Sequence, residues 1–117
     1  MPIALIVDDN FHNRNVCKLA LNHVGFSSVE AEDGEEALSL LSKNIYDLLL
    51  LDLSMPKIDG VEVLERIKTM GLSEKMVIVV VTAHSEMTAN VHEAADFIMY
   101  KPIDIMMFSS FLKRLQS

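Results

Sequence analysis

The sequence predicts a doubly wound α/β fold, in which helices cover both faces of a parallel sheet. Short apolar runs alternate with longer segments of helical period along the whole chain. Several of these runs are apolar at every position, as is typical of strands that are buried on both faces. No linker, repeat or low-complexity tract interrupts the alternation in 117 residues, so we expect a single domain over residues 1–117.

The first half of the chain contains three predicted strands, which are residues 3–7, 27–31 and 47–51. The helix between the first two is expected to bury one face, made of Val16, Leu19, Ala20 and Val24, and to end at Gly25. Acidic residues at 33–36 favour the start of a second helix, because they lie at its positive end. Its predicted buried face consists of Ala37, Leu38 and Leu41. The strand at 47–51 is the most apolar, so we place it centrally.

The second half continues the alternation after a turn rich in helix breakers at 53–60. A third helix is expected to bury Val61, Leu64, Ile67 and Met70 and to end at Gly71. The fourth strand is predicted at 76–81, a weakly amphipathic helix at 86–95, and the fifth strand at 97–100. The last helix, 105–115, is expected to bury Ile105, Phe108, Leu112 and Leu115.

Polar side chains follow four of the five predicted strands. Right-handed crossovers restrict such a sheet to a few strand orders, and the flavodoxin-like order 2-1-3-4-5 makes strands one and three neighbours. Asp8 and Asp9 follow the first strand, and Asp52 follows the third. Thr82 follows the fourth strand and Lys101 the fifth. The sequence therefore predicts that these five side chains share the carboxyl rim of the sheet.

This set of side chains predicts a metal-dependent chemistry. Three carboxylates within a few ångströms of one another repel, so a cation is needed to compensate them. Oxygen ligands without Cys or His favour a hard cation, and Mg²⁺ suits a site of one or two carboxylates, waters and a phosphate. A metal, the Lys101 ammonium, the Thr82 hydroxyl and the Asp52 carboxylate together indicate phosphoryl transfer to an aspartate.

Composition excludes several other classes of protein. Ten Lys and Arg against 17 Asp and Glu give a net charge of −7 without a basic stripe, so direct binding to nucleic acid is not expected. The single cysteine, Cys17, cannot form an internal disulfide, which favours a reducing cytoplasm. The amino terminus lacks the pattern of a signal peptide, and no apolar run approaches membrane-spanning length. We therefore expect a cytoplasmic protein that does not insert into membranes.

Ordered motifs cover essentially the whole chain. They are residues 7–10 (VDDN), 33–38 (DGEEAL), 47–52 (DLLLLD), 55–60 (MPKIDG), 82–83 (TA) and 101–102 (KP). With these spacings the chain resembles the receiver domain of bacterial response regulators. The segment Asp8-Asp9-Asn10 followed by Asn13-Arg14 also resembles receivers attached to hybrid histidine kinases, although a standalone receiver fits equally well.

The resemblance implies a role for each acidic residue. Asp52 would be the nucleophile that takes a phosphoryl group from a phosphohistidine, on a histidine kinase or a histidine phosphotransfer protein. Asp9 and Asp52 would bind Mg²⁺ directly, together with the backbone carbonyl of Ser54. Asp8 would act on the metal through a bound water.

The resemblance also implies a switch. Lys101 would contact the phosphoryl group, the Lys101–Pro102 bond would be cis, and the Thr82 hydroxyl would move to bond the phosphoryl oxygens, which changes a partner-binding surface. The output partner is not identified by the sequence, and a monomer or weak dimer is expected. The chain would not be an enzyme, although it would slowly hydrolyse its own acyl phosphate.

Two positions depart from the family pattern. Ile98 stands three residues before Lys101, where the family has Tyr or Phe, and strand alternation places Tyr100 on the same face as Ile98. From Thr82 to Lys101 there are 19 positions (101 − 82), which is short for the family by about one helical turn. Both departures concern the output face, so the family's usual output surface is not predicted for this chain.

Three alternative functions compete with this interpretation. A receiver-like interaction module that does not depend on phosphorylation is the main one. A phosphohydrolase of the haloacid dehalogenase type would need a second aspartate where Ser54 stands. A flavin or nucleotide binder would need glycines that the first strand–helix turn lacks.

Overall fold

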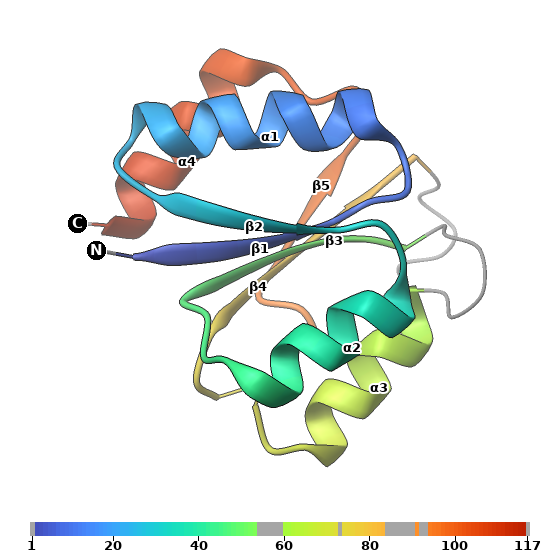
Figure 1. Cartoon of the computed structure of the whole chain (residues 1–117). Helices are drawn as coiled ribbons and strands as arrows, with labels where there is room; N and C mark the ends of the chain where they lie inside the picture. Colours follow the sequence, from blue (N-terminus) through green and yellow to red (C-terminus); the bar gives the residue numbers. More distant parts are fainter. Residues whose placement is uncertain (1, 54–59, 73, 84–90, 92–93, 117) are drawn as a thin grey trace.

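Five parallel strands form one sheet at the centre of the molecule (Figure 1). The structure is a computed structural model that describes residues 2–53, 60–72, 74–83, 91 and 94–116. The strands are β1 (Ile3–Val7), β2 (Ser27–Ala31), β3 (Leu48–Asp52), β4 (Val77–Thr82) and β5 (Phe97–Tyr100). Their order is β2-β1-β3-β4-β5, so the predicted α/β fold and strand order are confirmed.

The described residues form four helices, two on each face of the sheet (Figure 1). One face carries α1 (Phe11–His23) and α4 (Ile105–Gln116), and the other carries α2 (Gly34–Lys43) and α3 (Gly60–Thr69). The predicted helix at 86–95 lies largely outside the described residues. None of the helices in the described ranges is long and apolar enough to span a membrane.

The core consists of two apolar layers, because alternate strand residues point to opposite faces of the sheet. The layer against α2 and α3 contains Leu5, Leu49 and Val80, and the layer against α1 and α4 contains Ile6, Leu50 and Val79. Every residue of β3 is buried, and β3 lies between β1 and β4 as predicted. The strand that carries Asp52 is therefore held on both faces and both edges.

Local signals place the helix starts near the rim of the sheet. The Asn10 side chain accepts a hydrogen bond from the Asn13 amide and caps α1 directly after the Asp8–Asp9 pair. Asp33 caps α2 in the same way through the Glu36 amide. Gly25 follows α1 with φ 93°, a conformation that side chains disfavour, and so ends the helix where predicted.

Three predicted core positions are wrong. Leu19 is 55% exposed, because the inner face of α1 is formed by Arg14, Cys17, Ala20 and Leu21. A position two residues from Cys17 and Leu21 lies about 200° around the helix from each of them, which turns it outward. Met70 and Ile105 are also exposed, since Met70 follows the last residue of α3 and Ile105 is the first residue of α4.

The two leucine environments make a testable contrast. Leu49 is fully buried in β3, so Leu49→Ala is expected to lower the free energy of unfolding by about 2–5 kcal/mol. Leu19→Ala removes an exposed side chain and is expected to change it by no more than about 0.5 kcal/mol. Urea unfolding of both variants measures the difference, and similar losses in the two would contradict the orientation of α1.

Candidate functional site

Three carboxylates gather at the carboxyl rim of the sheet. Val7 of β1 pairs with Leu51 of β3, so Asp8 and Asp52 continue two neighbouring strands. Asp8 and Asp52 are buried, whereas Asp9 is exposed. Each of the three offers a carboxylate oxygen, and these oxygens all lie within 4.8 Å of one another. The predicted acidic cluster is thus brought together by the strand order.

Lys101 lies between two of these carboxylates. Its Nζ is 3.3 Å from Asp8 Oδ2 and 3.4 Å from Asp52 Oδ2. Burial lowers the pKa of Lys101, but the negative charges of Asp52 and Asp8 outweigh that effect and raise it above 10.5. The ammonium is therefore held in its charged form between the two acids.

Thr82 is the last residue of β4 and is fully buried. Asp52 pairs with Val81, so Thr82 extends one residue further toward the rim that carries the acids. The Thr82 carbonyl accepts a hydrogen bond from the Lys101 amide at 2.9 Å. A hydroxyl-bearing residue and the cationic residue are thereby tied together by the backbone.

The arrangement fits a hard cation and a phosphoryl group. Three carboxylates against one ammonium leave excess negative charge, and carboxylate oxygens are ligands that Mg²⁺ prefers. One buried carboxylate beside an ammonium is also the pairing that aspartyl phosphorylation needs, because the lysine can neutralise charge on the phosphoryl oxygens. Ser54, whose carbonyl was predicted as a third metal ligand, lies outside the described residues.

Comparison with protein families matches residues 4–111 to the response regulator receiver domain. The chain belongs to this family. Receiver domains work in two-component systems, where they take phosphoryl groups from histidine kinases or phosphotransfer proteins. They are signalling domains rather than classical enzymes.

Curated relatives of the receiver domain include kinases and regulators. The sensor histidine kinase RcsC of Salmonella typhimurium is 35% identical over 102 residues, which is 86% of this chain and 11% of RcsC. Response regulator MprA of Mycobacterium sp. strain KMS is 37% identical over 106 residues, 87% of this chain and 45% of MprA. The chain thus spans less than half the length of either. Sporulation initiation phosphotransferase F of Bacillus subtilis is 35% identical over 71% of this chain and 65% of its own.

Solved structures show the same fold. The response regulator TrrA of Thermotoga maritima, solved in complex with Mg²⁺–BeF, is 33% identical with a TM-score of 0.86, covering 98% of this chain and 99% of TrrA. A receiver domain from Methylobacillus flagellatus is 26% identical with a TM-score of 0.88 and covers 98% of each chain.

The start of α3 is fitted closely against the end of β3 in this receiver domain. Gly60 donates its amide to the Leu53 carbonyl at 3.0 Å. A Cβ at Gly60 would lie 2.5 Å from Leu53 Cα and 2.6 Å from the Asp52 carbonyl oxygen, distances that no side chain tolerates. The absence of a side chain at Gly60 therefore lets α3 begin directly beside Asp52.

The strand β5 carries the two hydrophobic residues on which the expected departures from the family depend. Ile98, at the family's aromatic position, packs against the apolar layer that faces α2 and α3, whereas Tyr100 is half exposed. The Lys101–Pro102 bond is cis, as predicted.

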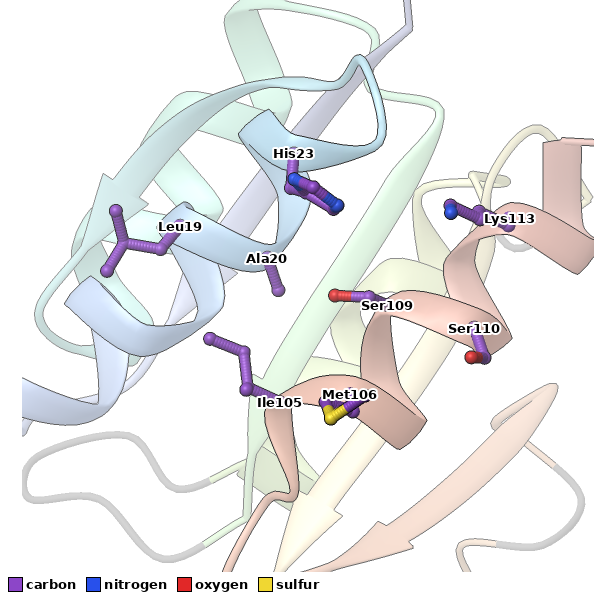
Figure 2. A pocket seen from close by; sticks show the side chains of 8 residues that line it. All are labelled: Leu19, Ala20, His23, Ile105, Met106, Ser109, Ser110 and Lys113. Carbon is purple, nitrogen blue, oxygen red and sulfur yellow. The ribbon is translucent and has the colours of Figure 1, made fainter.

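A separate hollow of about 400 Å³ lies between α1 and α4 (Figure 2). His23 of α1 and Lys113 of α4 line it, together with the apolar side chains of Leu19 and Met106. Neither helix contains an Asp or Glu, so this hollow belongs to a different chemical environment from the acidic rim.

Sequence reasoning missed one residue of the site. Arg14 is buried on the inner face of α1, and its Nη1 donates a 2.7 Å hydrogen bond to the Asp8 carbonyl. Apolar periodicity considers only apolar residues, so it gave Arg14 no place on the predicted buried face. The signal available was its spacing, since Arg14, Cys17 and Leu21 share one helical face.

The ion pairs of Lys101 predict a pH dependence of stability in the metal-free protein. Because folding raises the pKa of Lys101, its stabilising charge is fully present below 10.5 and is lost as the pH rises through the higher folded value. The stability gap between wild type and Lys101→Met should therefore be widest below pH 10.5 and shrink as the pH rises above that value.

Urea unfolding across this pH range measures the gap. Lys43→Met, which removes an exposed lysine of α2, is the matched control and should show a flat difference. A gap for Lys101→Met that stays constant or widens with pH would contradict the ion-pair geometry.

Proposed function

We propose that this receiver domain accepts a phosphoryl group on Asp52 from a histidine kinase or histidine phosphotransfer protein, with Mg²⁺ as cofactor. The observation that carries the proposal is the buried Asp52 carboxylate, paired with Lys101 Nζ at 3.4 Å beside two further carboxylates. The proposal is supported by two similar proteins, one named as a sensor histidine kinase and one as a phosphotransferase. We also propose that residues 1–117 form one domain. This domain would act in the cytoplasm as a monomer or weak dimer.

The donor set fits Mg²⁺. Asp9 and Asp52 would bind the ion directly with the Ser54 backbone carbonyl, and Asp8 would act through a water, since its Oδ1 and Oδ2 already face the Asn10 amide and Lys101. The bound ion would neutralise charge on the phosphoryl oxygens. TrrA, a 33% identical relative, was solved with Mg²⁺–BeF.

The transfer itself is a single displacement at phosphorus. A carboxylate oxygen of Asp52 attacks the phosphorus, the bond from phosphorus to the histidine nitrogen breaks, and the electron pair stays on that nitrogen. The products are an acyl phosphate on Asp52 and a free histidine on the donor. Lys101 then exchanges its contact with the Asp52 carboxylate for one with the phosphoryl oxygens, which keeps the ammonium paired throughout.

The switch would begin at Thr82. New negative charge on Asp52 attracts the Thr82 hydroxyl, and the Thr82 carbonyl is hydrogen-bonded to the Lys101 amide, so movement at one strand end reaches the other. The output partner would recognise the surface near β4 and β5. Water would slowly hydrolyse the acyl phosphate and reset the domain.

An interaction module that does not depend on phosphorylation is the second candidate. The observation that favours it is Ile98, a partly buried aliphatic residue that packs against the core at the position where the family couples an aromatic side chain to the threonine. The same experiments separate the two, because only the proposed phosphoacceptor changes with Mg²⁺ and a phosphoryl donor.

Phosphoryl acceptance is tested with acetyl phosphate and Mg²⁺. The wild type is expected to gain one phosphoryl group on Asp52, seen by intact mass and localised by peptide mapping. Asp52→Asn should gain none, since an amide is not a nucleophile toward phosphorus. Glu35→Gln removes an exposed carboxylate of α2 and should be labelled like wild type. Labelling of Asp52→Asn at another residue would sink the assignment.

The switch is tested at Thr82. Thr82→Ala should still accept the phosphoryl group but lose the phosphorylation-dependent amide shifts in β4 and β5, because no hydroxyl is left to bond the new oxygens. Thr82→Ser restores the hydroxyl and should recover these shifts. Two-dimensional NMR with and without beryllofluoride makes the comparison, and unchanged shifts in Thr82→Ala would exclude this hydroxyl as the trigger.

A further inference from the structure

We propose that Arg14 is a positioning residue that holds the backbone on which Asp9 presents its carboxylate to the metal. The inference rests on the proposed function, because it gives the acidic cluster its metal. It draws on a buried arginine that the phosphoryl transfer itself does not use.

Arg14 is bound from three directions by described residues. Its Nη1 donates to the Asp8 carbonyl at 2.7 Å, and its Nε donates to Glu30 Oε1 of β2 at 3.1 Å. Its Nη2 lies 3.7 Å from Glu32 Oε1. Only 8% of its side chain is exposed, and the Phe11 ring lies 5.8 Å from the guanidinium. The guanidinium therefore has one fixed position between α1, β1 and β2.

Both peptide groups that flank Asp9 are held by hydrogen bonds. The Asp8–Asp9 peptide is held through the Asp8 carbonyl by Arg14. The next peptide is held through the Asn10 amide, which donates to Asp8 Oδ1 at 2.9 Å. The Asp8 amide in turn donates to the Ala31 carbonyl at 3.2 Å. Since φ and ψ of Asp9 lie between two fixed peptides, the direction of its side chain is set by these bonds.

Asp9 depends on this backbone restraint more than Asp8 and Asp52 do. Asp8 and Asp52 are buried and paired with Lys101, whereas Asp9 is exposed. An exposed carboxylate on an unrestrained loop would sample several orientations and would lose conformational entropy when it binds a metal. Arg14 removes part of that cost before the metal arrives. Its own burial is in turn compensated by the carboxylate of Glu30.

The decisive variant is Arg14→Lys, which keeps the charge but cannot reach both Glu30 and the Asp8 carbonyl with the same fork geometry. We expect its Mg²⁺ dissociation constant to rise about tenfold in titration calorimetry, as when the supports of metal ligands are removed elsewhere. The Asp9 amide signal should shift already in the metal-free protein. In acetyl phosphate reactions, the Mg²⁺ concentration for half-maximal rate should rise with the maximal rate nearly kept.

Two further variants separate positioning from charge and from stability. Glu30→Gln keeps an oxygen that accepts the Arg14 Nε–H bond and should bind Mg²⁺ within about twofold of wild type. Arg66→Lys alters an exposed arginine of α3 that pairs with Glu62, away from the acidic rim, and should leave Mg²⁺ affinity unchanged.

The proposal is overturned if Arg14→Lys lowers the melting temperature while its Mg²⁺ affinity and Asp9 amide signal match wild type, since Arg14 would then be purely structural. It is also overturned if Glu30→Gln, which keeps an acceptor for the Arg14 Nε–H bond, weakens Mg²⁺ binding as much as Arg14→Lys, because the loss would then not follow the hydrogen-bond geometry of Arg14. Failure of the proposed function would appear separately, as phosphoryl labelling of Asp52→Asn.

Discussion

The ammonium of Lys101 between Asp8 and Asp52 is the interaction on which the rest of this structure depends. Two buried carboxylates on neighbouring strands repel each other more strongly than a pair on the surface does, and the ammonium between them offsets that repulsion. Lys101 supplies that cation from the end of β5. The ion pairs thus connect the end of β5 to the ends of β1 and β3. Backbone hydrogen bonds connect only strands that are neighbours in the sheet, and β5 has β4 as its neighbour.

The sheet makes this charge balance possible by fixing where each strand ends. β3 is buried along its whole length, so the position of Asp52 follows from the packing of both apolar layers. The close fit of Gly60 against the Asp52 carbonyl adds a second restraint from α3. A rigid scaffold with polar groups at its strand ends suits the proposed phosphoryl transfer, because positioning and charge neutralisation account for most of the acceleration of such a reaction.

Much of this could be predicted from the sequence, for identifiable reasons. Apolar runs bounded by Asp8 and Asp52 report strand ends directly, and the order of a parallel sheet then brings those ends together. The inner face of α1 could not be predicted in the same way. Arg14 is drawn inward by partners on β1 and β2, which are distant in sequence, while Leu19 is left outside. Helical periodicity counts apolar residues and does not register such tertiary contacts. The position of the Lys101 ammonium between Asp8 and Asp52 likewise depends on side-chain rotamers, which sequence patterns do not specify.

The buried cysteine of α1 gives the domain a form of chemical selectivity. Burial, with a contribution from nearby Asp8, raises the pKa of the Cys17 thiol to about 12, although Lys101 opposes the shift. Thiolates rather than thiols react with peroxides and disulfides, so this side chain stays inert at neutral pH. Oxidants and electrophiles that modify exposed cysteines therefore have no thiol target on the folded domain, whose single cysteine is Cys17. The phosphoryl chemistry proposed for the rim is in this way kept separate from thiol redox chemistry.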